Sequence, residues 1–413
     1  MASLYSTVGR TTTAYQYRAP IETINRLPSD EQAQIVGQSY NPKLYKYTTR
    51  TTEPNMTMVY DYNQPQIKIE SNLEPYMTSD FEPKPKSKYN YPKDIDTDVP
   101  KIEMYEEVKI SGKPFKKILN FDSIYLQQEV LGHGTFGVVS KYLDIRNNKM
   151  YAIKFVFIKD NAQLNDIHNE IMIMRYISDS SIDIVNYYGS FLIERDGKLY
   201  YAIVMDYIQG ISLDTYIKYL IDNRQSMEYD KLYQFAIWLF TTISKLHSYD
   251  IVHRDIKPDN IMVNLKTGRF ILIDFGIACS IHDGYEYACD INSFISPLLY
   301  TAPEIYKYTG QNRTTIPNAI DIYKKADIWQ CGITLYVLIN HKLPWENASD
   351  RELVNEIKGF RGFDQLFFPK DVPILNDLIT ACTRPDYTTR PTAMESLHFL
   401  NIKKDKFLAM VRH

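Results

Sequence analysis

The pattern of apolar and polar positions along the chain changes near residue 115. Before it, Tyr, Thr, Pro and Asn dominate, and runs of Leu, Val or Ile are few. In residues 81–94 three prolines block regular strand pairing and the lysines repel one another. Because such a segment buries too little apolar surface to offset its chain entropy, we expect residues 1–115 to be a largely disordered N-terminal extension. Its many tyrosines leave open a second interpretation, a docking or regulatory arm.

After residue 120 the pattern becomes regular. The runs that fit short strands occupy residues 123–132, 136–145, 149–158 and 199–208. One helical pattern interrupts them at 164–177, where apolar residues recur three and four positions apart. Beyond Gly210 helical patterns dominate, as in residues 229–248. Strands followed by helices favour two unlike lobes over alternating βαβ units, which predicts an α+β fold.

The predicted domain therefore occupies residues 116–405. We expect a small β-rich N-lobe over about 121–206 and a larger, mainly helical C-lobe over about 209–405. No internal repeat is apparent in the sequence.

Charge and cysteine content narrow the class of protein. The formal net charge is −3 and the pI is about 6.3, so no global charge favours nucleic acid or an anionic membrane as a partner. The four cysteines show neither a CxxC pair nor zinc spacing, which predicts a reduced, intracellular protein without a disulfide framework. No secretory signal or membrane-spanning run is evident, so we expect a soluble protein whose compartment stays open.

Three glycines lie between the first two predicted strands, at Gly132, Gly134 and Gly137. Without a Cβ atom, a glycine lets the backbone approach phosphate groups closely. A tight hairpin turn has the same content, so the motif is weak by itself. The strand that follows disfavours a Rossmann site, which needs a helix there.

A lysine interrupts the apolar strand over residues 151–154. A buried ammonium group is costly unless an opposite charge meets it. Glu170, on the predicted helix that follows, is the natural partner of Lys154. The alternative is an edge lysine that reaches solvent.

The most specific signal is a pair of short segments, residues 251–263 and 270–278. Asp255 and Asn260 lie five residues apart on a predicted loop, and Asp274 ends an apolar run. Asp274 and Asn260 carry the oxygen ligands that suit Mg²⁺. Either segment alone could be a chance turn, but both in this order and spacing indicate a site.

Together these residues resemble the eukaryotic-type serine/threonine protein kinases, over roughly residues 121–400. The positions that match the family motifs are Gly132, Gly134, Gly137 and Val139 in the glycine-rich loop, Ala152 and Lys154 in the third strand, Glu170 in helix C, His253–Arg254–Asp255 and Asn260 in the catalytic loop, Asp274–Phe275–Gly276, Ala302–Pro303–Glu304, Asp327, Trp329 and Gly332 in helix F, and Arg390 as the partner of Glu304.

The resemblance implies a transferase that moves the γ-phosphate of ATP, with Mg²⁺, to Ser or Thr hydroxyls of protein substrates. It assigns Asp255 as catalytic base and Lys257 to the γ-phosphate, a lysine typical of Ser/Thr kinases. It assigns Mg²⁺ to Asn260 and Asp274. The residues expected around the nucleotide are Leu131, Gly132, Gly134, Gly137, Val139, Ala152, Lys154, Glu170, Met205, Asp206, Ile208 and Asp274. The resemblance also implies an apolar spine of Tyr187, Met174, Phe275 and His253.

Some features depart from the family pattern. Ser296 or Pro297 replaces the usual threonine before residue 302, and residues 305–327 exceed the usual length by roughly ten residues. Ser293 and Ser296 are candidate sites for a phosphate that would meet Arg254. Three rival hypotheses remain: a pseudokinase or scaffold, a kinase for a small molecule or lipid, and an N-terminal arm that is itself the main functional unit, for instance as a binding segment.

Overall fold

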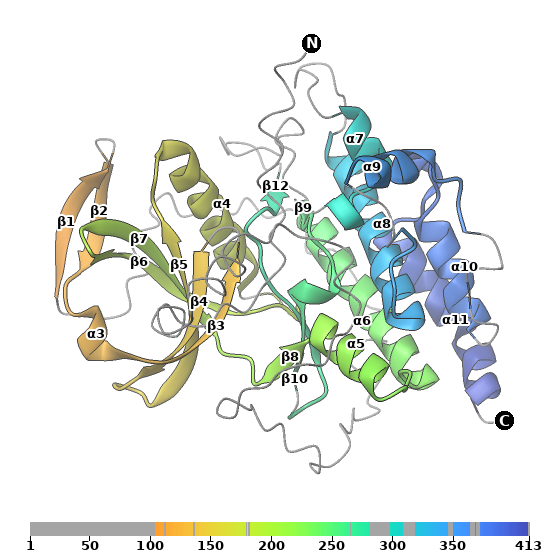
Figure 1. Cartoon of the computed structure of the whole chain (residues 1–413), viewed down its shortest axis with the longest axis horizontal. Coiled ribbons are helices and arrows are strands. Elements are labelled where there is room, and N and C mark those ends of the chain that lie inside the picture. Colours follow the sequence, from red (N-terminus) through yellow and green to blue (C-terminus); the bar gives the residue numbers. More distant parts are fainter. Residues whose placement is uncertain are drawn as a thin grey trace, which may run out of the picture.

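The computed structural model describes residues 104–110, 113–134, 137–178, 180, 182–264, 266–280, 298–308, 319–345, 350–363, 368 and 372–411. Within them the chain forms two unlike lobes, one rich in strands and one mainly helical (Figure 1). The expected disorder before residue 104, the candidate phosphate sites Ser293 and Ser296, and residues 309–318 of the long segment lie outside the described residues.

The N-lobe is built on one sheet, which has seven strands among the described residues in the order β1-β2-β6-β7-β5-β4-β3. Neighbouring strands run antiparallel except β2 and β6, which run parallel. The strands are β1 Tyr105–Ile110, β2 Lys113–Ile118, β3 Tyr125–Gly134, β4 Gly137–Asp144, β5 Lys149–Phe157, β6 Tyr187–Arg195 and β7 Lys198–Asp206.

The sheet begins earlier than the sequence suggested. We expected the folded domain to start at residue 116, but that boundary falls inside β2, and β1 lies wholly before it. Phe115 is buried, and Val108 and Ile110 pack against the same core. The strands escaped notice because β1 is an edge strand whose other positions are mostly charged and exposed.

The two faces of this sheet pack against different partners. One face forms a separate cluster with the short helix α3 (Phe121–Ile124), including aromatic contacts around Phe121. The other face carries α4 (Asn161–Ser178) and belongs to the main core, which continues into the C-lobe. Successive side chains of a strand point to opposite faces of the sheet, so alternate residues of one strand contribute to the two clusters.

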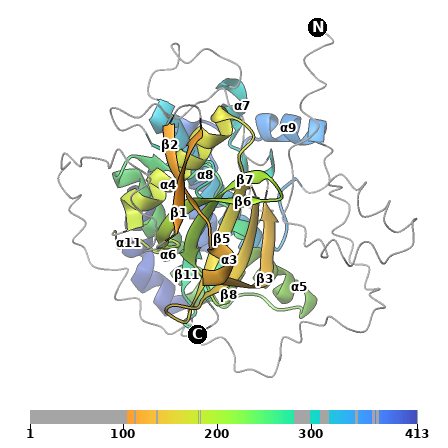
Figure 2. The same ribbon diagram turned by 90° about the vertical axis from the view of Figure 1, so that its left-hand side faces the viewer.

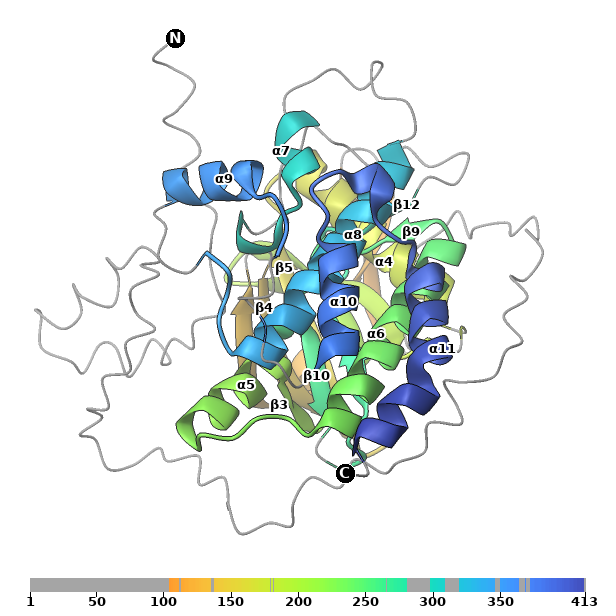
Figure 3. The same cartoon turned by 90° about the vertical axis from the view of Figure 1, so that its right-hand side faces the viewer.

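The C-lobe packs its helices around α8, which is buried on nearly all sides and lies at the centre of the lobe (Figure 3). A Cβ on Gly332 of α8 would lie 2.9 Å from Cys382 Cβ, so the glycine allows α8 and α10 to pack closely. The helices are α5 Leu213–Asp222, α6 Tyr229–Ser248, α7 Pro303–Tyr308, α8 Ala319–Asn340, α9 Asp350–Gly359, α10 Pro373–Cys382 and α11 Ala393–Val411.

Two small sheets lie where the lobes meet. One has the order β11-β10-β8 and the other β12-β9. Their strands are β8 Gly210–Ser212, β9 Ile251–Val252, β10 Ile261–Asn264, β11 Phe270–Leu272 and β12 Cys279–Ser280. They hold the two motif-bearing segments of the sequence beside each other.

Among the described residues no helix is both long and apolar enough to span a bilayer. Cys331 and Cys382 are buried free thiols, as expected. Cys279 is disulfide-bonded, so the expectation of reduced cysteines is wrong for this residue.

Candidate active site

Lys154 of β5 and Glu170 of α4 form a buried ion pair. Lys154 Nζ lies 2.6 Å from Glu170 Oε1, and both side chains are almost fully buried. The lysine therefore does not reach solvent at the edge of the sheet. Burial lowers the pKa of Lys154, but the carboxylates of Asp274 and Glu170 outweigh this effect and raise it above its usual value.

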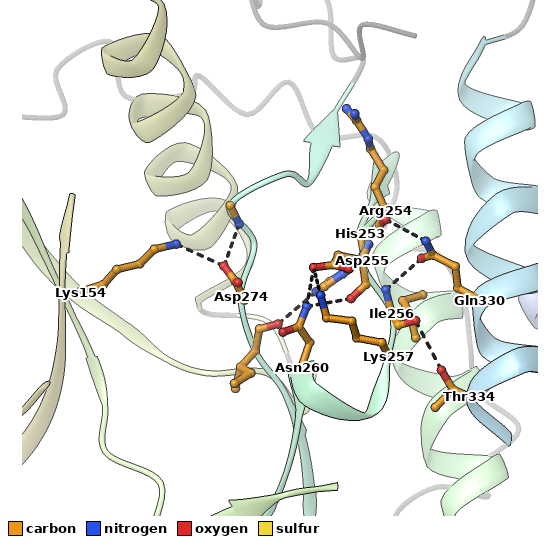
Figure 4. A network of polar contacts seen from close by, with 12 residues as sticks. Lys154, His253, Arg254, Asp255, Ile256, Lys257, Asn260, Asp274, Gln330 and Thr334 are labelled. Carbon is orange, nitrogen blue, oxygen red and sulfur yellow. Dashed lines mark hydrogen bonds and ion pairs between the residues drawn. The ribbon is translucent and has the colours of Figure 1, made fainter. Parts of the chain in front are cut away.

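Asp274, from the C-lobe, contacts the same lysine. Its Oδ1 lies 3.2 Å from Lys154 Nζ and accepts the backbone N–H of Gly276 (Figure 4). Burial opposes ionisation of this carboxyl, but Lys154 prevails and lowers the pKa of Asp274 to about 2. The group is therefore ionised throughout the physiological pH range, as a metal ligand must be.

The catalytic-loop residues predicted from sequence also meet. Asp255 Oδ2 accepts hydrogen bonds from Lys257 Nζ at 2.9 Å and from Asn260 Nδ2 at 2.8 Å. Asn260 lies in the 3₁₀ turn Pro258–Asn260, and its Nδ2 also donates to the Asp255 carbonyl at 2.9 Å. This short turn fixes the two side chains against each other (Figure 4).

Two oxygens of this cluster remain available. Asp255 Oδ1 and Asn260 Oδ1 are buried and accept no hydrogen bond from the described residues. An unsatisfied buried acceptor is costly, which suits an oxygen reserved for a substrate hydroxyl or a cation. The described residues contain no cluster of three or more His, Cys, Asp or Glu able to hold a metal. The oxygen of Asn260 and the carboxylate of Asp274 are of the type that Mg²⁺ prefers in proteins.

Helix α8 anchors the catalytic loop through side chains on one of its faces. Asp327 accepts the backbone N–H groups of His253 at 2.9 Å and Arg254 at 2.8 Å. Gln330 accepts from Ile256 N and donates to the Arg254 carbonyl (Figure 4). The sequence singled out Asp327 but missed Gln330, although its position three residues later on a helix is a usable signal.

Backbone conformation at the site is unusual. Arg254 has φ +68° and Asp274 has φ +63°, both in the left-handed region that non-glycine residues rarely adopt. Such conformations persist only where surrounding contacts enforce them. Here the enforcing contacts are those to Asp327 and Lys154.

The sheet register places five of the twelve residues expected around the nucleotide on one face. Val139 pairs with Gly132 and with Lys154, and Ala152 pairs with Met205. Because paired residues share a face, these positions lie on the same face as the lysine.

The remaining expected nucleotide residues are placed less directly. Asp206 ends β7, and Tyr188 Oη and Asn186 Nδ2 donate to its carboxylate. Ile208 follows in the segment that joins the lobes and is partly buried, whereas Leu131 is 41% exposed beside a bulge in β3.

Only part of the glycine interpretation has a structural counterpart. A Cβ on Gly137 would lie 2.0 Å from the Phe155 carbonyl oxygen, so close packing on β5 requires this glycine. Gly134 pairs with Gly137 where β3 and β4 meet. The absence of a Cβ at Gly137, which we expected to let the backbone approach phosphate, is thus also required for the packing of β4 on β5.

The four residues expected as an apolar spine lie in or against the main core. Met174 and Phe275 are buried in it, and Tyr187 packs against it. The rings of His253 and Phe275 meet edge to face at 5.0 Å. Burial lowers the pKa of His253, and the nearby carboxylates oppose the shift only partly, so the ring is neutral at pH 7.

One contact at the site had no signal in the sequence. Asn169, beside Glu170, donates through Nδ2 to the Ala278 carbonyl at 2.7 Å. This bond joins α4 to the segment after Asp274 across 109 residues of chain. Such a pairing depends on the tertiary fold and leaves no local pattern.

Asp259, next to Asn260, is expected to make stability depend on pH. Burial and Asp214 raise its pKa to about 6, against the opposing effects of Lys257 and Lys218. Since the folded pKa exceeds the unfolded one, this carboxyl destabilises the protein increasingly as pH rises from about 4 to about 6. Asp259→Asn should therefore stabilise the fold by on the order of 1–2 kcal/mol at pH 7.5, allowing for partial exposure.

The measurement is urea unfolding of wild type and Asp259→Asn at pH 4.5 and 7.5. The gain should be largest at pH 7.5 and shrink toward pH 4.5. Asp222→Asn, an exposed carboxylate at the end of α5, is the matched control and should show no such trend. An equal gain at both pH values would contradict the assignment to Asp259.

Comparison with known proteins identifies the domain. The sequence model of the protein kinase domain matches residues 125–400. The serine/threonine-protein kinase dst1 of Dictyostelium discoideum is 30% identical over 289 residues, which cover 68% of this chain and 35% of that protein. The kinase dst4 of the same organism is 31% identical over 290 residues, covering 69% and 55%. Calcium-dependent protein kinase 27 of Arabidopsis thaliana is 28% identical over 248 residues, covering 59% and 47%.

The chain thus spans between 35% and 55% of the length of these relatives. The family match nevertheless covers well over half of the chain and includes every motif residue described above. The chain belongs to the protein kinase family.

Proposed function

We propose that this chain transfers the γ-phosphate of ATP to serine and threonine hydroxyls of protein substrates. One observation carries the proposal: Lys154 contacts both Glu170 and Asp274, and the hydrogen-bonded pair of Asp255 and Asn260 lies beside them (Figure 4). Within the described part of the chain, Oδ1 of each of these two residues accepts no hydrogen bond. Phosphoryl transfer requires positioning and charge stabilisation more than covalent help. The site supplies fixed charges of both signs in a buried setting.

Each residue then has a defined role. Lys154, held by Glu170, binds the α- and β-phosphates. Asp274 and Asn260 would hold Mg²⁺, which would neutralise charge on the phosphate oxygens. Asp255 Oδ1 orients the attacking hydroxyl and accepts its proton.

Lys257 supports the choice of Ser and Thr as acceptors because a lysine two residues after the catalytic aspartate is typical of Ser/Thr kinases. Its Nζ lies 2.9 Å from Asp255 Oδ2, so its charge is next to the group that receives the proton. From there it can contact the transferred phosphate.

Backbone groups of Asp206 and Ile208, between the lobes, are proposed to bind adenine.

A buried ion pair in the C-lobe favours protein substrates over small molecules. Glu304 of α7 is fixed by Arg390 in a buried pair. Because Arg390 also donates to the Lys325 carbonyl of α8, the pair joins α7 to the helix that anchors the catalytic loop, and we infer that this rigid surface supports a polypeptide. Protein docking through residues 1–103 is part of the proposal, and deleting them should weaken substrate capture more than turnover of a short peptide.

The test is transfer of radiolabelled phosphate from ATP to mixed protein substrates in the presence of Mg²⁺, followed by phosphoamino-acid analysis. Labelled phosphoserine or phosphothreonine is the expected result, and chelation of Mg²⁺ should abolish it. An Asp274→Asn chain, prepared identically, controls for a contaminating kinase. Phosphotyrosine alone, or no transfer to any protein, would overturn the proposal.

A further inference from the structure

The hairpin of β1 and β2 is an addition to the kinase domain. The family match begins at residue 125, whereas the hairpin spans Tyr105–Ile118. It extends the N-lobe sheet at the edge strand β6 through the parallel pair Lys117–Leu192. This chain therefore carries a sheet edge that the matched domain does not include.

The register sets which way the hairpin faces. Phe115 shares a face of β2 with Lys117, whose partner is Leu192. Leu192 pairs in turn with Tyr201 of β7, and Tyr201 lies two residues from the partner of Lys154. Because paired and alternate residues share a face, Phe115 lies on the same face of the sheet as Lys154.

On that face Phe115 packs against α4. Its side chain is only 4% exposed, and its ring lies 5.6 Å from that of His168. The His168 ring in turn meets Tyr201 edge to face at 5.7 Å. Figure 2 shows the hairpin in front of α4 when the N-lobe faces the viewer. His168 lies two residues before Glu170 on the same helix.

The position of α4 decides whether Glu170 reaches Lys154. A buried ion pair gains little net free energy, because desolvation opposes the Coulomb attraction. The pair alone is thus a weak clamp, and apolar packing must hold the helix in place. Phe115 supplies such packing through its contact with His168, and the bond of Asn169 to Ala278 holds the same helix.

We propose that the β1–β2 hairpin holds α4 in the orientation in which Glu170 meets Lys154, with Phe115 as the positioning residue. This inference rests on the proposed kinase function for its catalytic consequence. The structural part, that Phe115 orders α4, stands without it.

Hydrogen exchange of the full chain tests the structural part. In Phe115→Ala, amides of α4 should exchange at least about tenfold faster than in wild type, while those of α6 and α8 remain unchanged. Leu119→Ala is the matched control, since Leu119 is 52% exposed just after β2. Unchanged exchange in α4 would overturn the proposal, whether or not the chain proves to be a kinase.

Kinetics test the catalytic part. Phe115→Ala should lower kcat/KM for ATP at least about tenfold and leave KM for a peptide substrate unchanged. Phe115→Leu, which keeps an apolar side chain, should recover most of this loss. In a Glu170→Ala background, Phe115→Ala should have little further effect, because the contact that it positions is gone.

A full additional loss in the Glu170→Ala background would show that Phe115 acts only on general stability, and would overturn the positioning role. If wild type transfers no phosphate at all, the proposed function fails, and hydrogen exchange still decides the role of the hairpin.

Discussion

Replacing Asp255 by alanine is expected to lower kcat for phosphate transfer by roughly 10²–10⁴-fold, with the fold and the affinity for ATP close to wild type. Asp255 Oδ1 is buried without a hydrogen bond from the described residues, so it is free to accept the substrate proton. Removing it leaves Lys154 and Asp274 in place. The loss should therefore appear in kcat and not in nucleotide binding.

The measurement is steady-state phosphorylation of a peptide at saturating ATP, together with nucleotide titration and thermal unfolding. Asp255→Asn is the stricter variant, because its amide keeps the shape of the side chain but cannot act as a base. It should be nearly as inactive as the alanine variant. Near-normal turnover in either variant would contradict the role assigned to Asp255.

Replacing Arg390 by alanine is expected to destabilise the fold by roughly 3–5 kcal/mol. Its guanidinium binds both carboxylate oxygens of Glu304, at 2.6 and 2.8 Å, and both residues are buried. It also donates to the carbonyls of Lys325 and Arg384 and lies 4.9 Å from the Trp329 ring centroid. Alanine would leave a buried carboxylate and two carbonyls without these donors.

Urea unfolding of the full chain measures this loss. Arg384→Ala removes an arginine whose hydrogen bond is exposed, and it should cost less than about 1 kcal/mol. The double variant Arg390→Ala with Glu304→Gln should be more stable than Arg390→Ala alone, since no buried charge remains. If the double variant is the less stable of the two, the lost pair does not explain the effect.

Much of the fold was predictable from sequence because it depends on local periodicity. The alternation in residues 149–158 and 199–208 predicted the central strands, and the spacing in 164–177 predicted α4. The boundary near residue 115 was wrong for the opposite reason. The apolar positions of β1 and β2 are too few and too mixed with charge to stand out, and only pairing with β6 shows that they belong to the sheet.

The candidate site divides in the same way. The pair of Arg390 and Glu304 and that of Lys154 and Glu170 were expected from sequence, and both are present. The bond of Asn169 to Ala278 was not expected, because nothing local marks an asparagine for a carbonyl 109 residues away.

The sequence by itself determined the two-lobed architecture, the family and the identity of the polar residues at the site. These follow from the order and spacing of residues, which the amino-acid sequence contains completely. Only the tertiary structure decided which oxygens accept no hydrogen bond from the described residues, which side chains of α8 hold the catalytic loop, and that a hairpin outside the matched domain packs against α4 at His168. The physical reason is that burial and hydrogen-bond satisfaction depend on every neighbour in space, and most of those neighbours are distant in the chain.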